Sequence, residues 1–87
     1  MSSKGTSFAT TGRMAFVVDL NVATNVMVMD AGNWSTYKRG GRAAYLDGGY
    51  FNRTPAVVHA PRAGSWWVVV DAPAGTTVRY TITPQPA

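Results

Sequence analysis

Residues 65–71 read Ser-Trp-Trp-Val-Val-Val-Asp, and no other stretch constrains the fold as strongly. Side chains of a β-strand alternate between two faces, so Trp66 and Trp67 point to opposite sides and the valines make both sides apolar. A strand that is apolar on both faces lies inside a sheet that is covered on both faces. We therefore expect a central strand, with one tryptophan in the core and the other beneath a second layer, a partner or a ligand.

Further short strands are predicted before and after this stretch, because apolar and polar residues alternate between turn signals. They cover residues 13–21, 25–30, 42–46, 56–60 and 76–83, with residues 50–52 returning from a hairpin turn at residues 47–48. Prolines bracket residues 56–60, which predicts an edge strand, and prolines at 84 and 86 are expected to end the last strand. The longest helix candidate, residues 34–39, is expected to make about one turn because glycines follow it.

This pattern predicts an all-β fold: a compact single-domain antiparallel β-sandwich or partly open barrel of about six to eight short strands. The chain has 87 residues, which is enough for one domain and one core. We assign residues 13–87 to that domain. Residues 1–12 are rich in Ser, Thr and Gly, and we expect them to form a flexible N-terminal arm.

Composition narrows the possible functions. Eight Lys and Arg residues oppose four Asp and no Glu, which gives a formal charge of +4 and favours anionic partners. The absence of cysteine excludes a thiolate nucleophile and a disulfide framework. No apolar run approaches the roughly 18 residues of a membrane span, and no convincing signal peptide is present. We therefore expect a cytoplasmic protein without membrane association.

The functional prediction rests on residues 33–53, where cations, aromatic rings and glycine pairs are interleaved. This combination suits an anionic ligand that contains a ring. Four cations are assigned to phosphate, one amide to a base or ribose edge, and three rings to stacking. The candidate ligand-binding residues are Asn33, Trp34, Tyr37, Lys38, Arg39, Arg42, Tyr50 and Arg53.

Individual features of this segment also have structural explanations. Gly40-Gly41 could turn backbone N–H groups toward a phosphate, or the charges around it could simply keep a solvated turn from aggregating. Tyr45 and Phe51 are assigned to the core rather than to the site. Side chains suited to acid–base catalysis are scarce. His59 is the single histidine; it could form an acid–base pair with an aspartate, but we expect it to bond backbone or water at a strand end. No catalytic residue, metal site or cofactor is therefore predicted.

Five blocks of the sequence together resemble the bacterial domain of unknown function 1883 family. They are residues 29–30 (Met-Asp), 33–40 (Asn-Trp-Ser-Thr-Tyr-Lys-Arg-Gly), 48–49 (Gly-Gly), 54–57 (Thr-Pro-Ala-Val) and 64–71 (Gly-Ser-Trp-Trp-Val-Val-Val-Asp). Order and spacing agree over about residues 17–78. Family members often carry two histidines where this chain has Ala43-Ala44 and Ser65, so roles that depend on those histidines are not carried over.

The resemblance implies a compact β-domain of a kind that accompanies TIR-type domains, which signal with NAD-derived nucleotides in anti-phage immunity. We therefore expect a non-enzymatic domain that binds a small phosphorylated ligand, such as a cyclic or NAD-derived nucleotide, as a sensor or a sponge. The alternative is a protein–protein interaction module that docks to a TIR-type effector or forms a homo-oligomer. Nucleic acid ranks below a small nucleotide, because the cations cluster in one loop instead of along several strands.

Overall fold

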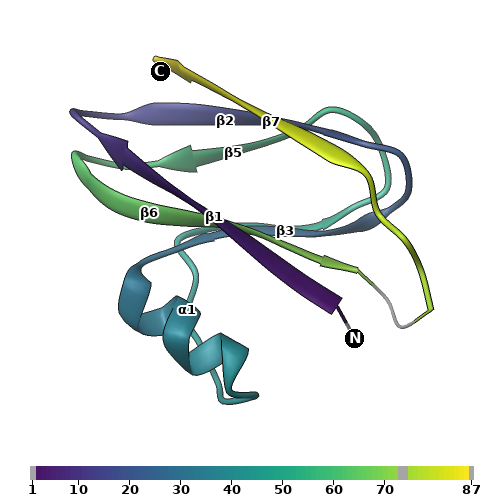
Figure 1. Cartoon of the computed structure of the whole chain (residues 1–87). Helices are drawn as coiled ribbons and strands as arrows, with labels where there is room; N and C mark the ends of the chain where they lie inside the picture. The colour runs from purple at the N-terminus through teal and green to yellow at the C-terminus, as the bar shows by residue number, and fades with distance from the viewer. Residues whose placement is uncertain (1, 73–74, 87) are drawn as a thin grey trace.

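The computed structural model describes residues 2–72 and 75–86, and within them seven strands and one helix are formed (Figure 1). They are β1 (Ser2–Thr10), β2 (Met14–Leu20), β3 (Thr24–Met29), α1 (Ala31–Lys38), β4 (Asp47–Phe51), β5 (Ala56–Ala60), β6 (Gly64–Ala72) and β7 (Tyr80–Pro86). One sheet has the order β1-β6-β3-β4 and the other the order β5-β2-β7. Every pairing is antiparallel, so the predicted antiparallel β-sandwich is confirmed.

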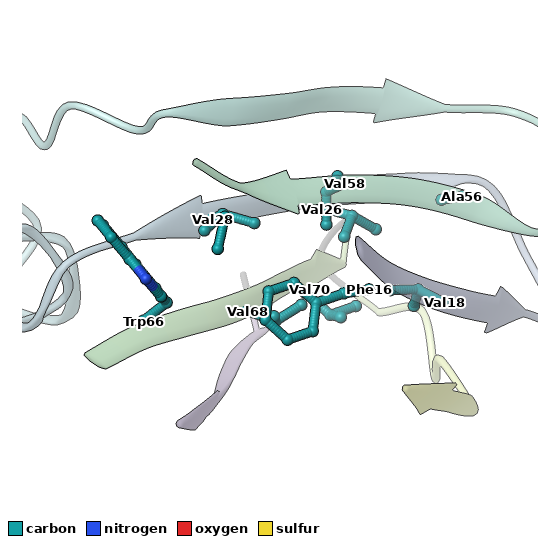
Figure 2. Packing of buried hydrophobic residues seen from close by; sticks show 10 residues of the cluster. Phe16, Val18, Val26, Val28, Ala56, Val58, Trp66, Val68 and Val70 are labelled. Carbon is teal, nitrogen blue, oxygen red and sulfur yellow. The ribbon is translucent and has the colours of Figure 1, made fainter. Parts of the chain in front are cut away.

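Strand β6 is central and covered on both faces, as its sequence predicts. Trp66, Val68 and Val70 point between the two sheets, where they meet Phe16 of β2 and Val26 of β3 (Figure 2). These residues are almost completely buried. Burying a Val or Phe side chain contributes about 1.5–3 kcal/mol each, so this layer is the main source of stability.

The other face of β6 is covered by helix α1. Figure 1 shows α1 on the side of the four-stranded sheet that faces away from the three-stranded sheet. Trp34 of the helix packs with Met27, Met29 and Val69, and its ring lies 5.7 Å from that of Trp67 in a stacked arrangement. Trp67 thus lies beneath a second layer that the chain itself supplies.

The prediction of a flexible N-terminal arm is wrong for residues 2–10, which form strand β1. The strand pairs with β6 along its whole length, from Ser2 opposite Ala72 to Thr10 opposite Gly64. Its small residues suit a strand beneath a helix: a Cβ on Gly5 would lie 2.6 Å from the Trp34 ring. A low content of apolar residues was therefore a poor guide to order in this segment.

The helix is longer than the single turn predicted for residues 34–39. Asp30 has an extended backbone and caps the helix, because its Oδ1 accepts a hydrogen bond of 2.8 Å from the N–H of Asn33. Aspartate is one of the preferred residues at this position. The cap starts the helix at Ala31, three residues before the predicted start at residue 34, and α1 ends at Lys38.

The predicted strand at residues 42–46 and the predicted hairpin turn at residues 47–48 are also wrong. Residues 42–46 lack regular structure, and their backbone is tied elsewhere: Leu46 N–H donates to the Val28 carbonyl at 2.8 Å. Asp47 and Gly48 lie inside β4. Gly48 is required there because its φ is +126° and a Cβ would lie 2.1 Å from the Val26 carbonyl oxygen.

The sheet edges follow the prolines in part. Strand β5 is an edge strand, as predicted from its bracketing prolines. Strand β7 occupies Tyr80–Pro86 instead of residues 76–83, and it continues through Pro84 and Pro86. Proline is tolerated there because β7 is also an edge, where one side of the strand has no hydrogen-bonding neighbour.

Candidate functional site

Only two of the eight predicted ligand-binding residues line a common pocket. Tyr37 and Lys38, from the last turn of α1, lie at a pocket of about 340 Å³, which we call the helix-end pocket. Its other lining residues are Ser3, Gly40, Gly41 and Asp71. The pocket therefore lies where the C-terminal end of α1 meets strands β1 and β6.

Asn33 and Trp34 are structural residues in this fold, which corrects their assignment to a ligand. The Asn33 side chain donates to Asp30 Oδ1 at 3.0 Å and accepts from the N–H of Ala44 at 2.9 Å, so both ends of its amide are engaged. Trp34 is 6% exposed and lies against Gly5. The Trp34 ring is therefore too buried to stack on a base, and the Asn33 amide is used mainly to hold the helix start and residue 44 together.

The glycine pair does not form the predicted phosphate cradle. The N–H of Gly40 donates to the Tyr37 carbonyl and that of Gly41 to the Thr36 carbonyl, each at 3.0 Å. Both donors are thus used to close the helix. Lys38 lies in the last helical turn and Arg39 at the C-cap, where positive charge offsets the negative end of the helix dipole.

The remaining predicted residues are exposed and dispersed. Arg39, Arg42 and Arg53 have exposed side chains and do not line the helix-end pocket. Tyr50 is 63% exposed on β4. Tyr45, which was assigned to the core, is 50% exposed, whereas Phe51 packs against the core as predicted.

Asp71 forms the buried floor of the helix-end pocket. It is only 4% exposed, and its Oδ2 accepts a hydrogen bond from the hydroxyl of Tyr37. Its Oδ1 is buried and has no hydrogen-bond partner among the described residues. Burial raises the pKa of the Asp71 carboxyl, because desolvation penalises its charged form. A buried acceptor without a partner is uncommon in folded proteins and calls for a ligand, an ion or water.

Asp71 belongs to a polar row that crosses the four-stranded sheet. Cross-strand register places Ser3 opposite Asp71, Asp71 opposite Asn25, and Asn25 opposite Tyr50. Directly opposed residues point to the same face of a sheet, and adjacent strands lie about 4.8 Å apart, so Tyr50 and Asp71 are separated by about 10 Å. This row lies on the face that α1 partly covers, because its residues alternate with those of the inner layer.

Sequence reasoning missed Ser3, Asn25 and Asp71. Ser3 was hidden in the supposed arm, and Asn25 in a strand whose outer cover was not foreseen. Asp71 did carry a signal: it is the one acid in a central strand that is otherwise apolar, a position where charge is rarely placed without a partner.

The pocket combines two kinds of chemistry. The free Oδ1 of Asp71 can accept a hydrogen bond from a hydroxyl or amine. Lys38 supplies a positive charge at the same pocket, and its Nζ lies 5.4 Å from the centre of the Trp34 ring. A ligand that carries both hydroxyl groups and an anionic group would satisfy both residues.

A histidine–aspartate pair lies elsewhere, between the two sheets. Asp47 Oδ2 accepts from the backbone N–H of His59 at 2.8 Å and lies 3.3 Å from its Nδ1. The pair links β4 of one sheet to β5 of the other. Within the described residues, no group of three or more His, Cys, Asp or Glu side chains is placed to hold a metal ion. In the same part of the chain, no helix has the length and apolar character needed to cross a bilayer.

Comparison with known proteins shows the family. The family described as Domain of unknown function (DUF1883) matches residues 11–85. The match includes all of α1 and strands β2 to β6, and β1 precedes it. No curated protein and no solved structure matches the chain. The chain belongs to the DUF1883 family.

Proposed function

We propose that this domain binds, without catalysis, a small phosphorylated ligand that carries free hydroxyl groups, such as a cyclic or NAD-derived nucleotide, in the helix-end pocket. The observation that carries the proposal is Asp71, which lines the helix-end pocket together with Lys38 and whose buried Oδ1 has no hydrogen-bond partner among the described residues. Ribose hydroxyls are common donors to an aspartate in nucleotide sites. Lys38 would pair with the phosphate as a point charge.

The polar row supports the rest of the ligand. Tyr50 exposes an aromatic face about 10 Å from Asp71, and stacking of a base on such a ring contributes about 1–3 kcal/mol. Asn25 lies between them and is partly exposed. Arg39 follows Lys38 at the helix end and would add positive charge near the phosphate. In the role that the family resemblance implies, the domain is a cytoplasmic sensor or sponge for nucleotides in anti-phage immunity.

The test is calorimetric titration of the purified protein with linear, cyclic and NAD-derived nucleotides. The proposal expects saturable binding of at least one compound. Replacing Lys38 and Arg39 together with Ala should abolish that binding, whereas Lys4→Ala, which removes a lysine outside the pocket, should not. Asp71→Asn should weaken a ribonucleotide more than its deoxy counterpart. Unchanged affinity in the double variant would overturn the assignment.

A second candidate is an interaction module, and strand β1 favours it. The sequence feature that suggested such a module is strand β6, which is apolar on both faces. Helix α1 covers the outer face of this strand, so β6 needs no partner there. Strand β1, however, is an edge of nine residues without proline, and a long flat edge is a template for another strand. Through it the domain would associate with a second copy or dock to a TIR-type effector. Sedimentation that shows a strict monomer, alone and with that effector, would count against this candidate.

A further inference from the structure

A second pocket opens at a different place in the sandwich from the helix-end pocket. It has a volume of about 490 Å³ and shares no residue with the helix-end pocket. Its lining residues come from the β1–β2 turn, the start of β4 with the residue before it, and the end of β5 with the turn that follows. They are Arg13, Leu46, Asp47, His59, Ala60, Pro61 and Arg62.

Two arginines and one aspartate line this pocket and give it a net positive charge. Arg13 and Arg62 are both exposed, and the one ion pair among the described residues, His59 with Asp47, involves neither of them. Asp47 brings one negative charge to the pocket, but its oxygens are engaged. Oδ1 accepts from the N–H of Gly48, and Oδ2 accepts from the backbone N–H of His59.

Arg62 is held in place by its surroundings. Its guanidinium carbon lies 5.1 Å from the centre of the Trp66 ring, in a cation–π arrangement. Its backbone carbonyl accepts from Trp66 Nε1 at 3.0 Å and from Thr10 Oγ1 at 3.1 Å. An arginine fixed in this way loses less conformational freedom when it binds an anion, and its planar fork suits a carboxylate or phosphate.

The pocket also has an apolar side. Leu46 is 52% exposed, and Tyr45 before it is 50% exposed, so two large apolar side chains in succession face solvent. Pro61 and Ala60 also line the pocket. Exposed apolar side chains next to positively charged ones are typical of a binding surface.

We propose that this pocket is a second binding site, for a small organic anion in which a carboxylate or phosphate is joined to an apolar group. Arg13 and Arg62 hold the anion, and the apolar group rests on Leu46 and Pro61. His59 lines the same pocket, and its ring can bond a polar atom next to the anion. The site is independent of the helix-end pocket and of any nucleotide bound there.

The test is a titration of the ¹⁵N-labelled full chain followed by NMR, with acetate, hexanoate and 4-phenylbutyrate at constant ionic strength. Saturable shifts are expected at Arg13, Leu46, His59 and Arg62. Affinity should rise at least about tenfold from acetate to 4-phenylbutyrate, because the apolar group is buried. Absence of saturable shifts for all three acids would overturn the proposal, as would shifts confined to other residues.

Variants separate the two halves of the site. The Arg13→Gln and Arg62→Gln double variant should bind 4-phenylbutyrate at least about tenfold more weakly. Arg79→Gln, which removes an exposed arginine from outside the pocket, should bind as the parent does. Leu46→Ser should reduce the advantage of 4-phenylbutyrate over acetate. Equal affinity in the parent and the double variant, with unchanged spectra elsewhere, would refute the arginine assignment. Because each shift reports on one residue, failure here is distinct from failure of nucleotide binding at Tyr37, Lys38 and Asp71.

Discussion

The two faces of the four-stranded sheet are built by alternate residues of the same strands, yet they differ in character. The inner face carries valines such as Val28 and Val68, which are completely buried against the second sheet. The outer face is covered by a helix of eight residues, which is too short to cover it entirely. Where the helix ends, Asp71 and its polar neighbours border a pocket. Complete cover thus produces stability, and incomplete cover leaves a pocket.

The largest expected effect comes from the inner layer. Phe16→Ala removes a ring that is completely buried between the sheets, and such a change costs about 3–5 kcal/mol of the free energy of unfolding. Tyr50→Ala is the matched control on the outer face, where the ring is 63% exposed, and it should cost less than about 0.5 kcal/mol. Urea unfolding measures both. Similar losses in the two variants would contradict the contrast between the faces.

The next effect tests whether the helix packs tightly on the outer face. Gly5→Ala places a Cβ within 2.6 Å of the Trp34 ring, so the helix must shift, at a cost of about 1–3 kcal/mol. Gly12→Ala is the control, because a Cβ at that position meets no atom within 4 Å. Thermal unfolding of both variants measures the difference in their stability. A stable Gly5→Ala protein would show that Trp34 is loosely held.

The inner face could be predicted from the sequence because its information is local. Strand alternation identifies Phe16 and Val18, and the doubly apolar run identifies β6 as central. The outer face could not be predicted in this way, because the helix that covers it has few apolar residues and is anchored mainly by Trp34. The partner of that ring is Gly5, which is almost thirty residues away and looks like part of a flexible tail.

The candidate site was only partly predictable for the same reason. Tyr37 and Lys38 were identified from the interleaving of rings and cations, and both line the helix-end pocket. The arginines that follow were expected to join them, but Arg39, Arg42 and Arg53 are exposed and do not line that pocket. Asp71 comes to the pocket through strand pairing with β1 and β3, which spacing in one sequence does not reveal.

A smaller effect, with a defined pH dependence, is expected at Asp71. Burial raises the pKa of its carboxyl above the ordinary 3.8, so the folded state binds the proton more tightly than the unfolded state. The wild-type protein therefore loses stability as pH rises through this raised pKa. Asp71→Asn carries no charge there and keeps an oxygen that can accept from Tyr37. Its stability relative to wild type should thus increase with pH and reach about 1–2 kcal/mol near neutrality.

Denaturant unfolding between pH 3 and pH 8 provides the measurement for Asp71. The two proteins should differ least at the acidic end, where the wild-type carboxyl is protonated in both states. A difference that stays constant across the range would show that the raised pKa does not contribute. A difference that shrinks with pH would mean that the charged form is stabilised in the fold, and the Asp71 oxygen would then have a partner.

The smallest effect on stability is expected at Lys38, where binding should change most. Lys38→Met keeps the length of the side chain but removes its charge over Trp34 and at the helix end, which should cost about 0.5 kcal/mol because the lysine is exposed. Under the proposed function, nucleotide affinity should fall at least about tenfold, since Lys38 is the cation proposed to pair with the phosphate. Lys4→Met controls for net charge. A large loss of stability with unchanged nucleotide affinity would show that Lys38 serves only to stabilise the end of α1. The outer face would then differ from the inner face only in how completely it is covered.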